Sequence, residues 1–64
     1  MDDTNVGDIT LLTVTETAKL LSVHRSTVYR LILEDSEFPA VYEFGFGKRF
    51  NKEDVLNYIL SKRT

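Results

Sequence analysis

Apolar residues in the middle of the chain recur at helical spacing in two short runs, separated by a break of a few residues. In the first run, Val14, Ala18 and Leu21 fall on one face of a helix. Just before them, Thr13 and Glu16 have the spacing of a capping box, in which each side chain bonds a free backbone amide of the other. The first run therefore predicts a short helix that begins directly after Thr13.

The second run predicts a helix from about Arg25 to Leu33. At about 100° per residue, Val28, Leu31 and Ile32 form one inward stripe. The break between the two runs leaves room only for a sharp turn, so the pair has the outline of a helix-turn-helix. The residues expected away from the stripe are polar, basic or aromatic, namely Arg25, Ser26, Tyr29 and Arg30.

After Pro39 the pattern changes from helical to strand period. Residues 41–44 alternate loosely, Gly45-Phe46-Gly47 supplies the positive-φ positions of a hairpin turn, and residues 48–50 return as a second strand. Asn51 then opens a third helix through a second capping sequence. The inward residues of this hairpin and helix are expected to form core, and include Tyr42, Phe44, Phe50, Val55, Tyr58 and Ile59.

The order helix, turn, helix, hairpin, helix predicts an α+β domain, mostly α, of the small winged helix-turn-helix type, with the hairpin as its wing. Sixty-four residues make one domain at most, and its stability must come from the apolar core. Residues 1–8 are polar and acidic without periodicity, and we predict a flexible acidic N-terminal tail over residues 1–10. Ile9, Leu11 and Leu12 form the first apolar cluster, which predicts a short extended segment that leads into the domain and packs on the core. The predicted DNA-binding domain covers residues 11–64.

The charge distribution changes the first impression given by the total. A net charge of −2 argues against a nucleic-acid partner, because DNA-binding domains are usually basic. However, Asp2, Asp3 and Asp8 supply three of the ten acidic residues, and the chain without them carries a net charge of +1. Several other carboxylates cluster between Glu34 and Glu43, apart from the basic residues. This segregation allows a basic face on an acidic protein.

The sequence offers little material for chemistry other than binding. Cysteine is absent, the single histidine has no evident serine or carboxylate partners, and no glycine-rich phosphate loop is present. We therefore expect no enzymatic activity, no metal site and no cofactor. No apolar run is long enough to span a membrane, and the first ten residues lack the features of a signal peptide, so a cytoplasmic location is expected.

The outer face of the second predicted helix fits the major groove of duplex DNA. Arg30 lies opposite the apolar stripe and suits guanine O6 and N7, whereas Arg25 in the first turn suits a phosphate, because helix N-termini favour anions. A merely solvated surface is the alternative for both arginines. Tyr29 alternatively packs half-buried on the first helix, and His24 alternatively serves only as a cap. The candidate recognition residues are His24, Arg25, Ser26, Thr27, Tyr29 and Arg30.

The candidate wing residues are Phe46, Gly47, Lys48 and Arg49. Lys48 and Arg49 are placed to contact phosphates, although Arg49 alternatively pairs with Glu53 or Asp54 in the third helix. An aromatic residue at a turn tip is unusual in so small a soluble protein. Three roles stay open for Phe46: a wedge at the DNA minor groove, a contact with a partner protein, and packing back on the core.

With these residues in place, the sequence resembles the excisionase and AlpA-like prophage regulator family, small winged helix-turn-helix domains related to the MerR type. The resemblance covers Leu11 to Leu60 and rests on the stretches LLTVTETAKLLSVHRSTVYRLI, EFPA and KRFNKEDVLNYI. Four positions depart from the family pattern. Ser22 replaces a glycine, His24 an N-cap serine, Thr17 an alanine and Tyr58 a tryptophan.

The resemblance implies that the protein binds double-stranded DNA beside an attachment site, bends it and assists a site-specific integrase in excision, with neighbouring copies of itself on the DNA. It implies equally a phage, prophage or mobile-element transcription regulator with the same domain, in the bacterial cytoplasm or nucleoid. A different class of function, a protein-interaction module, is favoured by the acidic cluster from Glu34 to Glu43. Duplex binding that weakens steeply with salt distinguishes the DNA binder from that module.

Overall fold

Three helices and a four-stranded antiparallel sheet make up the part of the chain that the computed structural model describes, residues 4–6 and 9–63. The elements follow in the order β1 (Thr4–Val6), β2 (Ile9–Thr13), α1 (Val14–Leu21), α2 (Arg25–Glu34), β3 (Val41–Phe44), β4 (Gly47–Asn51) and α3 (Lys52–Ser61). This order contains the predicted helix-turn-helix, hairpin and final helix. The predicted small winged helix-turn-helix fold is therefore confirmed.

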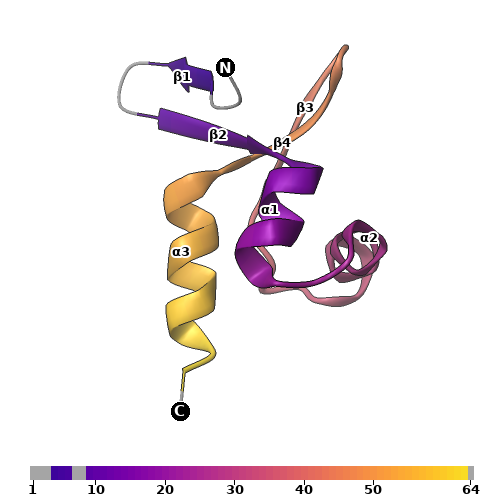
Figure 1. Cartoon of the computed structure of the whole chain (residues 1–64), viewed down its shortest axis with the longest axis vertical. Helices are drawn as coiled ribbons and strands as arrows, with labels where there is room; N and C mark the ends of the chain where they lie inside the picture. The colour runs from indigo at the N-terminus through magenta and orange to yellow at the C-terminus, as the bar shows by residue number, and fades with distance from the viewer. Residues whose placement is uncertain (1–3, 7–8, 64) are drawn as a thin grey trace.

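The sheet connects the wing to the helices. Its strand order is β1-β2-β4-β3, so β2 lies between the N-terminal strand and the hairpin. In the register of the strands, Phe50 of β4 pairs with Leu12 of β2 on one side and Val41 of β3 on the other. These three residues all belong to the core or pack against it. Figure 1 shows α1 between α2 and α3, with the β3–β4 hairpin extending past the helices.

Local backbone chemistry sets both ends of α1. At its start the predicted capping box is present: the Glu16 amide donates to Thr13 Oγ1 at 3.0 Å, and the Thr13 amide donates to Glu16 Oε1 at 2.8 Å. Ser22 ends α1 in the left-handed region, with φ of 61° and ψ of 42°. The amide of Val23 returns to the carbonyl of Ala18 at 3.0 Å. A glycine adopts this left-handed conformation without strain, which explains why the family pattern has glycine at the position of Ser22.

The core joins all three helices to the hairpin. Val28, Phe50 and Val55 have no exposed surface, and each was predicted to face inward. Phe38, from the loop after α2, packs edge-on against Phe50 and Tyr58, with ring centroids 5.6 Å and 5.1 Å apart. The loop thereby becomes part of the core, because edge-to-face aromatic contacts bury large rings in a small space.

The predicted core roles of Tyr42 and Phe44 are wrong. Tyr42 is 37% exposed and Phe44 is 38% exposed. Because side chains alternate along a strand, and Val41 packs against the core, Tyr42 and Phe44 point to the opposite face of the hairpin. The hydrophobic pattern also did not predict that the polar residue Thr17 of α1 is fully buried.

The prediction of a flexible tail over residues 1–10 differs from the structure at two places. Thr4–Val6 forms β1, which pairs antiparallel with the first part of β2, and Ile9 and Thr10 already belong to β2. Backbone pairing to a neighbouring strand needs no apolar period in the added strand, so this sequence pattern does not reveal it. The other residues of that predicted tail, 1–3 and 7–8, lie outside the described residues.

Replacing Thr17 by valine should stabilise the domain. Thr17 Oγ1 is buried and has no hydrogen-bond partner within residues 4–6 and 9–63, which costs roughly 1–3 kcal/mol for such a group, and valine keeps the same shape. We expect the free energy of unfolding to rise by about 1 kcal/mol, measured by urea denaturation. Thr15→Val is the matched control, because Thr15 is exposed on the same helix. Equal stability of the wild type and Thr17→Val would show that the hydroxyl is satisfied in solution.

Candidate nucleic-acid interface

The start of α2 is capped by an imidazole in place of a hydroxyl. His24 is the N-cap residue, and its Nδ1 accepts the amide N–H of Ser26 at 3.1 Å. The Ser26 hydroxyl lies 3.0 Å from the same nitrogen. This arrangement requires an unprotonated Nδ1. The ring therefore compensates for the missing N-cap serine, and α2 begins at Arg25 as predicted.

The outer face of α2 exposes most of the residues predicted to read DNA. Arg25, Ser26 and Arg30 are exposed, and Tyr29 retains 47% of its surface. Thr27 is partly covered. At about 100° per residue, Ser26 and Arg30 point away from buried Val28, Thr27 and Tyr29 lie on the flanks, and Arg25 lies in the first turn at the edge of the buried face. Their contact with DNA stays a prediction.

The electrostatics of this face favour an anion. The first turn of α2 contains no carboxylate, so the positive end of the helix dipole is uncompensated there. Arg30 Nε lies 3.9 Å from Glu34 Oε1, and the two side chains are 62% and 69% exposed. A pair this long and this exposed contributes little energy, so Arg30 can leave it at low cost.

The end of α2 is fastened to α3 by contacts that the sequence analysis did not predict. Asp35, the C-cap residue of α2, accepts the Tyr58 hydroxyl at 2.7 Å through Oδ2 and the Glu37 amide at 2.9 Å through Oδ1. Lys62 donates to Glu37 Oε1 at 3.1 Å and lies 5.3 Å from the centre of the Tyr58 ring. A tyrosine on an inward helix face usually needs a partner for its hydroxyl, which is the signal that could have revealed this link.

The same link shifts two titrations in opposite directions. The Tyr58 hydroxyl, followed by the Glu37 amide, holds the pKa of Asp35 below its ordinary value of 3.8. The carboxylate in turn raises the pKa of Tyr58 above its ordinary value of 10.0. Both shifts favour an ionised Asp35 that accepts a hydrogen bond from a protonated Tyr58. The link is therefore complete at neutral pH.

Tyr58→Phe should lower the melting temperature at neutral pH, because it removes the donor to Asp35. A carboxyl with a lowered pKa contributes stability above its unfolded-state pKa, and that contribution is lost as the pH falls through the lower folded-state value. The difference from the wild type should therefore shrink when melts are repeated below about pH 3.8. The control is Tyr42→Phe, since Tyr42 is exposed on the hairpin. A difference that persists at acid pH would assign the effect to ring packing.

The wing residues mainly contact one another. Lys48 forms an ion pair with Glu43 across the hairpin. Arg49 Nη1 donates to the Lys48 carbonyl at 2.9 Å, and its guanidinium carbon lies 4.9 Å from the centre of the Phe46 ring. The alternative pairing of Arg49 with the first turn of α3 is thus not found in the described structure. Phe46 does not fold back on the core, because it is 72% exposed.

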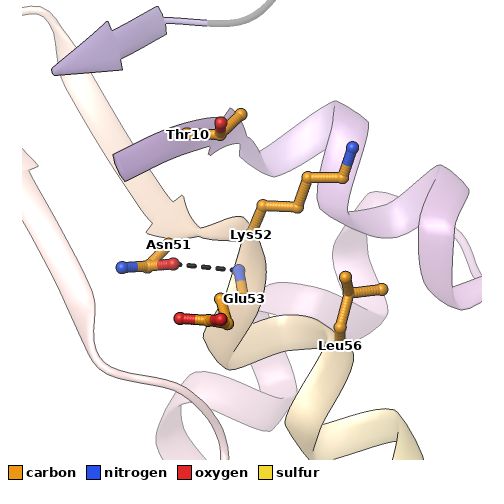
Figure 2. A pocket seen from close by; sticks show the side chains of 5 residues that line it. All are labelled: Thr10, Asn51, Lys52, Glu53 and Leu56. Carbon is orange, nitrogen blue, oxygen red and sulfur yellow. Dashed lines mark hydrogen bonds between the residues drawn. The ribbon is translucent and has the colours of Figure 1, made fainter. Parts of the chain in front are cut away.

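A pocket at the start of α3 is lined by Thr10, Asn51, Lys52, Glu53 and Leu56. Figure 2 shows Asn51 beside the backbone of Glu53, and Asn51 Oδ1 accepts that amide at 2.9 Å. The side chain of Lys52 extends toward α1. Over residues 4–6 and 9–63, no group of three histidine, cysteine or acidic side chains is placed to hold a metal. Nor is any helix within those ranges long and apolar enough to cross a membrane.

Comparison with known proteins agrees with this geometry. A family model described as a helix-turn-helix domain matches residues 11–63, which include both helices of the pair, the hairpin and α3. No curated protein and no solved structure gives a significant match.

Proposed function

Because the chain belongs to the helix-turn-helix domain family, whose members bind DNA sequence-specifically, we propose that it is an excisionase that assists an integrase at an attachment site. The observation that carries the DNA-binding role is the exposed basic face of α2, and a projecting hairpin carries two more basic residues. The excision role rests on the resemblance over Leu11 to Leu60.

In this proposal α2 enters the major groove and the hairpin contacts the adjoining backbone. Arg30 releases Glu34 and bonds a guanine edge, which supplies discrimination between bases. Arg25, together with the positive end of the α2 helix dipole, holds a phosphate and sets the position of the helix. A single module of this kind buries only about 600–1,000 Å² on DNA. Neighbouring copies or an integrase would supply the further affinity that a stable complex needs.

The test has two stages. Selection of the chain from a library of random duplexes should enrich one sequence, and affinity for that sequence should fall steeply with added salt. A recombination assay with the integrase encoded nearest the gene should then yield more excision product when the chain is added. Absence of any duplex binding would contradict the proposal and favour the protein-interaction module. Binding to the operator of a gene without any effect on excision would identify a transcription regulator instead.

Lys48→Ala should flatten the salt dependence of binding. If the wing lysine neutralises one phosphate, its loss lowers the slope of log affinity against log salt by about 0.9. The preference for the selected sequence should survive, because phosphate contacts position the protein without reading bases. Glu43→Gln is the matched variant: it frees Lys48 from its ion pair and should strengthen binding. An unchanged slope in Lys48→Ala would restrict Lys48 to bracing the hairpin.

A further inference from the structure

The tip of the β3–β4 hairpin carries a stacked pair of exposed aromatic rings. The rings of Phe44 and Phe46 are 5.0 Å apart between centroids and 3° from parallel. Phe46 occupies the turn and is the more exposed of the two. Exposed apolar surface that the fold does not use for its own core commonly marks a contact with a partner.

The pair is held in place before any partner binds. The guanidinium of Arg49 lies over the Phe46 ring and is anchored by its hydrogen bond to the Lys48 carbonyl. Gly47 makes room for this arrangement: its φ is +140°, and a Cβ there would lie 3.1 Å from Arg49 Nη1. The Phe46 side chain is held by the ring of Phe44 and the guanidinium of Arg49. Fixing this side chain when a partner binds therefore costs little conformational entropy.

The position of the rings matches a narrow site better than a flat one. The side chains of Tyr42 and Phe44 lie on the face of the hairpin opposite to the core. In the register of the two strands, Tyr42 is opposite Arg49 and Phe44 is opposite Gly47. Figure 1 shows this two-stranded ribbon extending beyond the helices, so its tip is narrow and accessible. The minor groove of B-DNA is about 6 Å wide and attracts arginine through its negative potential. A tip that combines apolar rings with Arg49 and Lys48 suits that groove.

We infer that Phe46, supported by Phe44, is a wedge that inserts between adjacent base pairs from the minor groove and kinks the duplex. The inference rests on the proposed function, because the duplex is the one that α2 binds. Phenylalanine is among the residues that unstack a base step in this way, with kinks of about 20–90° toward the major groove. On insertion the Phe46 ring exchanges its contacts with Phe44 and Arg49 for contacts with the bases, and the released Arg49 neutralises a nearby phosphate. The wing thereby supplies the bend, while α2 supplies the sequence preference.

The experiment measures bending and unstacking on the duplex enriched by selection of the wild-type chain. Donor and acceptor dyes at its two ends report the bend, and 2-aminopurine placed in turn at steps beside the α2 site reports unstacking. The wild type should raise both signals. Phe46→Ala should abolish most of the change in both and weaken binding roughly tenfold, whereas Phe46→Leu should retain much of the bend because it keeps an apolar wedge.

Leu60→Ala is the matched control, because Leu60 is an exposed apolar side chain on α3, away from the hairpin. It should bend the duplex as the wild type does. Circular dichroism of each variant verifies the fold. The wild-type 2-aminopurine signal tests the wedge without any variant.

Each result has one reading. Wild-type binding without bending or unstacking overturns the wedge and leaves DNA binding intact. Equal bending by Phe46→Ala and the wild type also overturns it, as does an equal loss in Leu60→Ala. If the wild type binds no duplex at all, the proposed function falls and the wedge with it. If Phe46 instead contacts the integrase and the DNA is neither bent nor unstacked, the wedge is also overturned and the rings are assigned to a protein partner.

Discussion

Val28→Asp is expected to unfold the domain. Val28 has no exposed surface and packs in the cluster that joins the helices to the hairpin. An unpaired carboxylate buried there costs several kcal/mol, while a domain of this size has only a few kcal/mol of stability in total. Circular dichroism should show loss of most helical signal, and binding to the selected duplex should disappear with it.

Leu33→Asp is the control for this prediction. Leu33 belongs to the same helix but is 86% exposed, so the same substitution buries no charge there. Its melting curve should remain cooperative, with a midpoint close to that of the wild type. A folded Val28→Asp protein would mean that α2 presents a different face to the core, and the assignment of its outer face would then have to be abandoned.

Arg30→Ala is expected to weaken binding to the selected duplex by about 1–3 kcal/mol, with the fold intact. Among the residues that the structure describes, its exposed side chain pairs only with Glu34, at long distance, so the folded state loses almost nothing when Arg30 is truncated. If Arg30 reads a guanine, the loss should be confined to duplexes that contain the preferred base, and repeat selection should relax the preference at that position. Competition titrations with single-base variants of the duplex measure both effects.

Arg63→Ala separates base reading from simple loss of charge. Arg63 is an exposed arginine beyond the end of α3, so its replacement removes the same charge far from α2 along the chain. It should weaken binding slightly and equally for all duplexes. Equal affinities for Arg30→Ala and the wild type would show that another part of the surface reads the DNA.

The largest difference between sequence and structure concerns the hairpin. Its strand period and turn glycines predicted the two strands correctly, but not which ring would be buried. Phe50 is central because β2 and β3 both pair beside it, whereas Phe44 lies near the turn, on the other face. Burial of a strand residue depends on neighbours that are distant in sequence, and a local pattern cannot supply them. Because Phe44 lies on the outer face and not in the core, it can stack on Phe46 at the tip of the wing.

Local features determined the helices, because their signals lie within a few residues of where they act. The capping box at Thr13, the left-handed position at Ser22 and the stripe through Val28 each specify backbone or packing within one or two turns. The order of these elements was enough to predict the fold class. The candidate reading face on α2 followed from the same periodicity, since a residue opposite a buried stripe must point outward.

Long-range contacts determined the rest. The pairing of Thr4–Val6 with β2, the link from Asp35 to Tyr58 and the unsatisfied hydroxyl of Thr17 each depend on elements that meet only when the chain is folded. Tyr58 lies 23 residues from Asp35 along the chain, and no periodic signal relates two positions so far apart. Hydrogen bonds and burial of this kind are properties of the packed whole, because each requires a partner whose position is set by the other elements of the fold.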